Sequence, residues 1–184
     1  MARPFFSLAL SLLLILTGCE DNLPKSICLD PDFSDADQAR IIQTIEEVNS
    51  TLGRDLFGPP VIIFTGVCSG HQPFSVQAFE DNEHRIYLGL KTDPAFAELN
   101  QIVDAEVAGF ATAQDVVLFP EVIDSDGFFR LTVLHELGHF LELAHINDPD
   151  AVMAPARLRN SEVSVYTTLD KQAFCLIHKC RYSP

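Results

Sequence analysis

Apolar residues recur every three or four positions in two long stretches of the chain, which is the spacing of one face of a helix. The first stretch begins at a candidate N-cap, Ser34, and ends at Gly53. Its apolar positions are Ile41, Ile45, Val48 and Leu52. The second stretch follows the capping residues of "DSDG" and is the strongest predicted helix. Its apolar positions are Phe128, Leu131, Leu134, Leu137 and Leu141.

Shorter patterns predict the remaining elements. The segment "PAFAELNQ" predicts a turn of helix with Pro94 at its start, and "TLDKQAFCLIHKC" predicts a last helix with Thr168 as its cap candidate and Asp170 in its first turn. The β-branched run "PPVIIFTGVC" and the shorter "HRIYLGL" are typical of strands. Two apolar runs within 105–123, separated by "AQ", predict a hairpin. This order predicts an α+β (mixed α/β) domain with a mixed sheet on one side of the helices.

The N-terminus has the features of an export signal. One early arginine precedes an apolar run from Phe5 to Leu16, which is too short to cross a membrane comfortably, and small residues follow. The "LTGC" segment resembles a bacterial lipobox, which implies that residues 1–18 are removed and that Cys19 carries the lipid anchor. A plain secretory signal with an incidental cysteine is the alternative. We therefore expect a lipidated tether over 19–27 and one domain over 28–184, in the bacterial cell envelope, facing the periplasm or the exterior.

Four cysteines remain after the signal: Cys28, Cys68, Cys175 and Cys180. An even number in an exported chain predicts two disulfides, with three possible pairings, and we favour a link from Cys28 to the C-terminal pair region. A zinc site made of these cysteines is disfavoured because no C-x-x-C spacing occurs.

Composition and charge exclude some partners. The chain of 184 residues has a formal charge of -14 and no basic cluster, so it has no electrostatic footprint for nucleic acid. The length fits one domain, and we expect a monomer whose acidity serves solubility.

The stretch "LHELGHFLELAH" contains the candidate chemistry. His135 and His139 are four residues apart and would project from one face of the predicted helix, where both imidazoles could bind one metal ion. Glu136 lies close enough to act on a water molecule at that metal without being a ligand. The alternative is a pair of surface histidines on an amphipathic helix, which this strongly patterned helix makes less convincing.

His145 follows ten residues after His135, and Met153 follows eight residues after His145, in "DAVMAP". This pattern resembles the metzincin zinc peptidases, and among them the matrixins and their bacterial relatives. The later "TTLDKQAF" also resembles the closing helix of that family. The resemblance implies that His135, His139 and His145 bind one catalytic zinc ion, that Glu136 is the general base, and that Met153 forms an apolar floor below the site.

The same resemblance implies a protein or peptide substrate that pairs with an edge strand of the hairpin. It points to a zinc endopeptidase. The alternative is a catalytically inactive, zinc-containing envelope lipoprotein that binds peptides or a partner protein. Glu136 favours the enzyme, because a binding module would have little need of a base.

Glu142 departs from the family pattern, which has glycine at that position. Glycine takes the left-handed conformation that ends the helix, and a glutamate there costs on the order of 1 kcal/mol. Alternatively the helix continues, and Glu142 binds the metal in place of His145 or accepts a hydrogen bond beside the ligands. We favour the turn, because His145 and Met153 both keep the family spacing.

Other polar segments have ordinary explanations. Calcium could be bound by the oxygens of "DSDG" and "NDPD", but such segments are more often caps and turns, so calcium has no support. His71, His84 and His178 have no partner at ligand spacing and are predicted to be surface residues. Arg157 and Arg159 lie where the family shapes its specificity pocket, although solvated arginines are the simpler interpretation.

Overall fold

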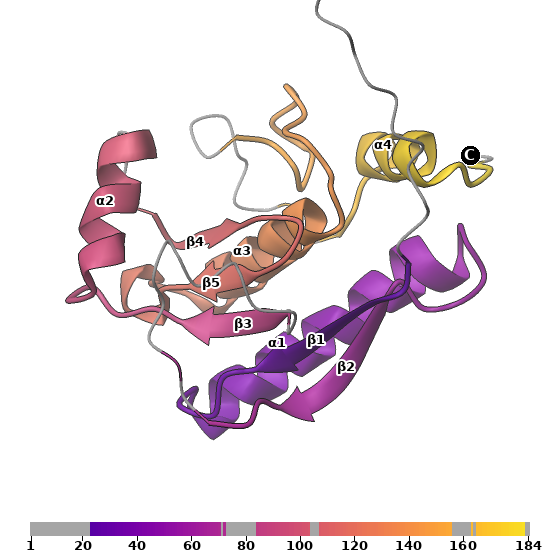
Figure 1. The fold of residues 1–184 in the computed structure, drawn as a ribbon. Coiled ribbons are helices and arrows are strands. Elements are labelled where there is room, and N and C mark those ends of the chain that lie inside the picture. The colour runs from indigo at the N-terminus through magenta and orange to yellow at the C-terminus, as the bar shows by residue number, and fades with distance from the viewer. Residues whose placement is uncertain are drawn as a thin grey trace, which may run out of the picture.

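The computed structural model describes residues 23–70, 72, 84–103, 107–155, 163 and 165–182 (Figure 1). The predicted signal peptide, the predicted lipidation site Cys19, and His71, Arg157 and Arg159 lie outside these residues. Within the described part, no helix is both long enough and apolar enough to cross a membrane.

Five strands of the described chain form one mixed sheet in the order β2-β1-β3-β5-β4. The strands are β1 (Lys25–Leu29), β2 (Ile62–Val67), β3 (Arg85–Leu88), β4 (Gly109–Ala111) and β5 (Val116–Leu118). The first four in the sheet order run parallel, and β4 pairs antiparallel with β5 as the predicted hairpin. The predicted fold class is confirmed, and β4 is the outermost strand on its side of the sheet.

Helices cover the sheet unequally. Helices α1 (Asp35–Val48) and α3 (Asp126–Phe140) contact each other, and α1 packs by β2 while α3 packs by β4 and β5 (Figure 1). Side chains alternate across the strands, so Ile86 and Val116 join the main core while Tyr87 and Val117 join a second apolar cluster. This second cluster includes residues of α2 (Pro94–Val103), so helical residues pack against both faces, not one.

The helices begin where the capping residues predict, with one shift. Ser34 caps α1 and Ser125 caps α3, each accepting a hydrogen bond from a backbone N–H of the first turn. Helix α1 continues as a π-helical segment, Asn49–Arg54, which includes the predicted end at Gly53. The cap of α4 (Thr168–His178) is Thr167 and not Thr168, because Thr167 forms a capping box with Asp170.

The first strand begins inside the predicted tether. Lys25 to Leu29 pair with β2 on one side and with β3 on the other, so residues 25–27 belong to the folded sheet. The segment is short and starts with a lysine, and its strand character comes from pairing on both sides and not from its own pattern. The folded sheet therefore begins at residue 25, within the tether predicted over 19–27.

The two predicted disulfides are present, but the favoured pairing is wrong. Cys28 is bonded to Cys68 and Cys175 to Cys180. Parallel pairing of β1 with β2 brings Cys28 and Cys68 together across a sequence separation of 40 residues. At the other bond the chain turns at Lys179 (φ 55°), which returns Cys180 to the last turn of α4.

Candidate metal centre

Helix α3 supplies three of the predicted site residues from a buried position. All residues from Leu131 to Gly138 are buried, including His135 and Glu136. The predicted apolar stripe was too narrow, since Phe128 is only half-buried while Phe129 and Val133 belong to the core. A helix enclosed on this many sides holds its polar side chains in defined positions.

The chain leaves α3 through a turn at Glu142, whose φ is 70°. The N–H of Glu142 donates to the carbonyl of His139 (2.8 Å), and the N–H of Leu143 donates to the carbonyl of Gly138 (2.9 Å). These two bonds and the left-handed residue form a Schellman motif with glutamate in the position that glycine usually takes. The helix therefore stops, and the interpretation in which it continues is wrong.

The turn brings the third histidine back to the first two. The Nε2 atoms of His135, His139 and His145 lie 3.1, 3.2 and 3.3 Å from one another, and no other such group of potential ligands occurs in the described residues. A tetrahedral zinc ion with Zn–N bonds of about 2.0–2.1 Å would hold its nitrogens about 3.3–3.4 Å apart. The donor set and its spacing fit zinc.

Backbone carbonyls orient two of the rings. Nδ1 of His135 lies 2.7 Å from the carbonyl oxygen of Val152, and Nδ1 of His139 lies 2.8 Å from that of Leu143. Because a carbonyl oxygen only accepts, each Nδ1 carries the proton and each Nε2 keeps its lone pair for the metal. His135 is buried, His139 is half-buried and His145 is exposed, so the site opens on the His145 side.

Met153 lies against the helix between the two histidines of α3. It is fully buried, and a Cβ atom on Gly138 would lie 2.2 Å from its Sδ. Glycine at 138 is therefore the residue that lets the segment around Met153 approach α3. Whether Met153 serves as the floor of the site stays a prediction.

The segment around Met153 is held by the carboxylate of Asp170, which the sequence pattern predicted only as an acidic residue in the first turn of the last helix. Asp170 is fully buried and accepts hydrogen bonds from the backbone N–H groups of Val152 and Met153, both at 3.0 Å. It also accepts from the N–H and hydroxyl of Thr167, both at 2.8 Å. Because the carbonyl of Val152 accepts from His135, Asp170 fixes the residue that orients this ligand. Its capping-box position in "TTLD" was the available signal.

Tyr166 holds the other flank of the motif. Its hydroxyl donates to the carbonyl of Leu134 at 2.6 Å. Burial, and next the negative charges of Asp170, Glu47 and Glu136, raise the pKa of Tyr166 well above its usual value of 10.0. The hydroxyl therefore stays protonated and remains a donor at neutral and moderately alkaline pH.

Glu136 lies between α3 and the edge of the sheet. It is 5% exposed, and a Cβ atom on Gly109 would lie 2.7 Å from its Cγ. Gly109 is the first residue of β4, so the candidate base is next to the outermost strand. Any larger residue at 109 would displace it.

Glu142 points to a different partner. Its Oε1 forms an ion pair with Nζ of Lys25 at 3.0 Å, and it is not a member of the histidine cluster.

Two histidines predicted to be surface residues are not on the surface. His178 is buried, with its Nε2 3.0 Å from the carbonyl oxygen of Leu141, and His84 is half-buried against the ring of Phe140. Within "DSDG" and "NDPD", Ser125 is a helix cap and Asp148 accepts from the N–H of Asp150, as caps and turns do.

No protein-family model matches the sequence, and no curated protein matches it. Among solved structures, the chain is similar to archaemetzincin from Methanopyrus kandleri, with a TM-score of 0.55, 15% identity, and coverage of 84% of this chain and 96% of that one. It is also similar to metalloproteinase-II from Bacteroides fragilis, with a TM-score of 0.49 and 13% identity, covering 84% of this chain but only 53% of that one. The first likeness shows that this chain has the archaemetzincin fold.

Proposed function

We propose that this protein is a zinc-dependent endopeptidase of metzincin type that hydrolyses peptide bonds in proteins. The main support is the convergence of the three Nε2 atoms of His135, His139 and His145, with the buried Glu136 beside them on α3. The fold it shares with archaemetzincin is consistent with this assignment.

In the proposed reaction Glu136 acts as general base. Its carboxylate takes a proton from the attacking water and later delivers it to the leaving amine. A zinc ion bound by the histidines would supply a Lewis acid that lowers the pKa of that water and stabilises negative charge on the carbonyl oxygen. The bonds from His135 and His139 to backbone carbonyls keep both rings in position during the reaction.

The substrate would lie in an extended conformation along β4. Among the described strands β4 is outermost, so its outer edge could pair with a peptide backbone, and Gly109 places it against Glu136. A peptide bound there would pass the candidate base and the exposed side of the histidine cluster.

Metal analysis and digestion of a peptide library test the proposal. We expect one zinc ion per chain and cleavage that Glu136→Gln reduces at least about 100-fold, since general bases contribute about 10²–10⁴-fold. Glu98→Gln, which alters an exposed glutamate of α2, is the matched control and should cleave normally. Bound zinc without Glu136-dependent cleavage would instead indicate the peptide-binding lipoprotein, and absence of zinc would refute both.

The cell-envelope location also stays a proposal. Lipidation of Cys19 would place the protein at a membrane, and fractionation of cells that produce the Cys19→Ala variant checks this. Retention of that variant in the membrane fraction would contradict the anchor.

A further inference from the structure

The first residue of β1 reaches the end of the motif helix. The ammonium group of Lys25 donates to the carbonyl oxygens of Phe140 (2.8 Å) and Ala113 (2.9 Å) and forms the ion pair with Glu142 (3.0 Å). These three acceptors match the three N–H donors of a lysine. The side chain of Lys25 is 6% exposed, so protein encloses it almost entirely, and its Nζ lies 5.2 Å from the ring centroid of Phe140.

Each acceptor belongs to a part of the candidate site. Phe140 is the last residue of α3, and Ala113 lies between β4 and β5. Glu142 is the left-handed residue of the turn that separates the second and third histidines. Lys25 therefore contacts three parts of the site at one point: the end of the motif helix α3, the edge hairpin formed by β4 and β5, and the turn at Glu142, called here the ligand turn.

The turn at Glu142 determines where two ligands lie. Leu143 follows it directly and its carbonyl oxygen orients the ring of His139, and His145 follows two residues later. A left-handed glutamate is disfavoured by its own backbone, whereas glycine would not be. The ion pair with Lys25 is a contact that Glu142 makes with its backbone in the observed turn.

We propose that Lys25 and Glu142 form a positioning pair that sets the ligand turn and so tightens metal binding by His139 and His145. In the metzincin pattern glycine occupies this position and needs no such partner. This inference rests on the proposed zinc site. Neither residue touches the metal or the substrate, so their effect acts through the geometry of the turn.

A double-mutant cycle on the full protein tests the pair by zinc affinity, measured by competition with a chromophoric chelator. We expect Lys25→Met to weaken zinc binding about 10-fold, the effect typical of groups that orient metal ligands. Glu142→Gly should bind zinc within about threefold of the parent, because glycine adopts the turn without help. Adding Lys25→Met to Glu142→Gly should then weaken zinc binding less than about threefold.

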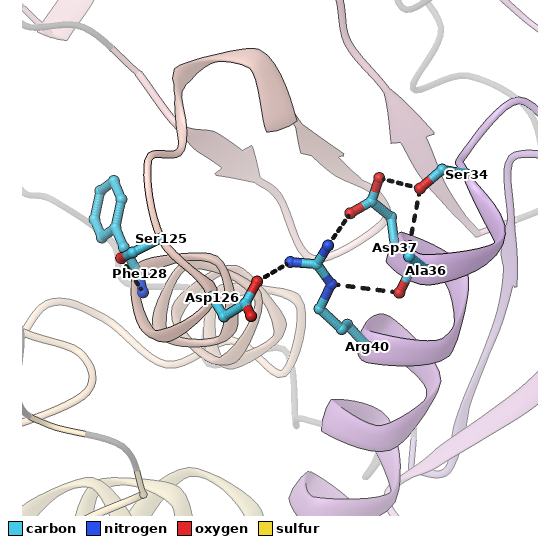
Figure 2. A network of polar contacts seen from close by, with 7 residues as sticks. All are labelled: Ser34, Ala36, Asp37, Arg40, Ser125, Asp126 and Phe128. Carbon is cyan, nitrogen blue, oxygen red and sulfur yellow. Dashed lines mark hydrogen bonds and ion pairs between the residues drawn. The ribbon is translucent and has the colours of Figure 1, made fainter.

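The control is Arg40→Met, which removes the ion pair between Arg40 and Asp126 at the opposite end of the same helix (Figure 2). It should leave zinc affinity unchanged. The absorption spectrum of bound Co²⁺ adds a second measurement, which should change in Lys25→Met, return toward the parent in the double variant, and stay unchanged in Arg40→Met.

Thermal unfolding of the metal-free proteins separates positioning from stability alone. Lower metal-free stability of Lys25→Met with parental zinc affinity and cobalt spectrum would refute the positioning pair and leave the zinc site standing. Failure of the parent to bind zinc would refute the zinc site and this inference with it. Glu142→Gln, which changes the more exposed partner, provides the same test if Lys25→Met does not fold, and we expect weaker zinc binding.

Discussion

Both ends of α3 are tied to another part of the chain by an ion pair, and the two pairs differ in burial. At the N-terminal end, Arg40 of α1 contacts Asp126 at 2.5 Å and Asp37 at 3.3 Å, where the side chain of Arg40 is 39% exposed and that of Asp126 is 89% exposed (Figure 2). At the C-terminal end, the side chain of Lys25 is 6% exposed and that of Glu142 is 38% exposed, and Lys25 also binds two backbone carbonyls.

The difference shows which end must be held in place. Exposed ion pairs contribute about 0–1 kcal/mol, because water and salt screen them and long side chains lose entropy. The ammonium of Lys25 is buried and hydrogen-bonded, so removing it costs more, because the carbonyl oxygens of Phe140 and Ala113 lose a donor. The end of α3 from which the metal ligands emerge has the buried contacts, while the end that only starts the helix has an exposed network.

The same change at two aspartates should give the largest contrast. Asp170→Asn places an amide where four donors meet a buried carboxylate, so we expect a loss of about 3–5 kcal/mol in unfolding free energy. Asp126→Asn, at the exposed end, should cost less than about 1 kcal/mol. Urea unfolding measures both, and zinc affinity should fall only in Asp170→Asn. Equal effects on stability would show that the buried hydrogen bonds of Asp170 contribute no more than the exposed ion pair of Asp126.

Alanine at the two glycines of α3 should give an intermediate contrast. At Gly138 the added methyl group would meet the Sδ of Met153 at 2.2 Å, and we expect a cost of about 1–3 kcal/mol with weaker zinc binding. At Gly127 the methyl group would meet nothing within 4 Å, so the variant should match the parent or gain about 0.5–1 kcal/mol from helix propensity. Denaturant titrations measure the change in unfolding free energy of both variants. A Gly138→Ala protein with parental stability and zinc affinity would contradict the packing argument.

Removing the hydroxyl of Tyr166 should have the smallest effect at neutral pH. Tyr166→Phe loses one hydrogen bond to Leu134 and should cost about 1 kcal/mol. Tyr182→Phe loses only an exposed bond to Thr168 and should change stability less. Unfolding at pH 7 compares them.

The pH dependence of the same variants makes the test sharper. The folded-state pKa of Tyr166 lies above its unfolded value of 10.0, so the folded protein holds this proton more tightly. Its contribution is complete below pH 10 and decreases as the pH rises from there through the folded pKa. As the pH rises above 10, the unfolding free energy of Tyr166→Phe should therefore decrease less than that of the parent. Equal decreases would show that Tyr166 does not cause the alkaline destabilisation.

Local patterns were sufficient to predict the helices, the hairpin and the ligand turn. Ser34 and Ser125 are caps that act within their own first turn, and the spacing from His135 to Met153 is set along one continuous segment. The turn at Glu142 was predictable for the same reason, although its residue type argues against it. These features depend on neighbours in sequence.

Contacts between distant segments were not predictable in this way. Lys25 appeared to belong to a tether because its partners, Phe140 and Glu142, lie more than a hundred positions away. The bond between Cys28 and Cys68 depends on the parallel pairing of two strands, and the strand that contains Cys28 was not predicted. Only the assembled fold shows that these residues meet.

The hydrogen bonds of Asp170 also determine when the site can form. A chain that has been synthesised only as far as Met153 already contains all three histidines and Glu136, but it lacks the carboxylate that binds the amides of Val152 and Met153. The C-terminal helix is thus the last part needed to complete the centre during synthesis. Premature termination or trimming before α4 would remove this carboxylate while leaving all three histidines in the chain.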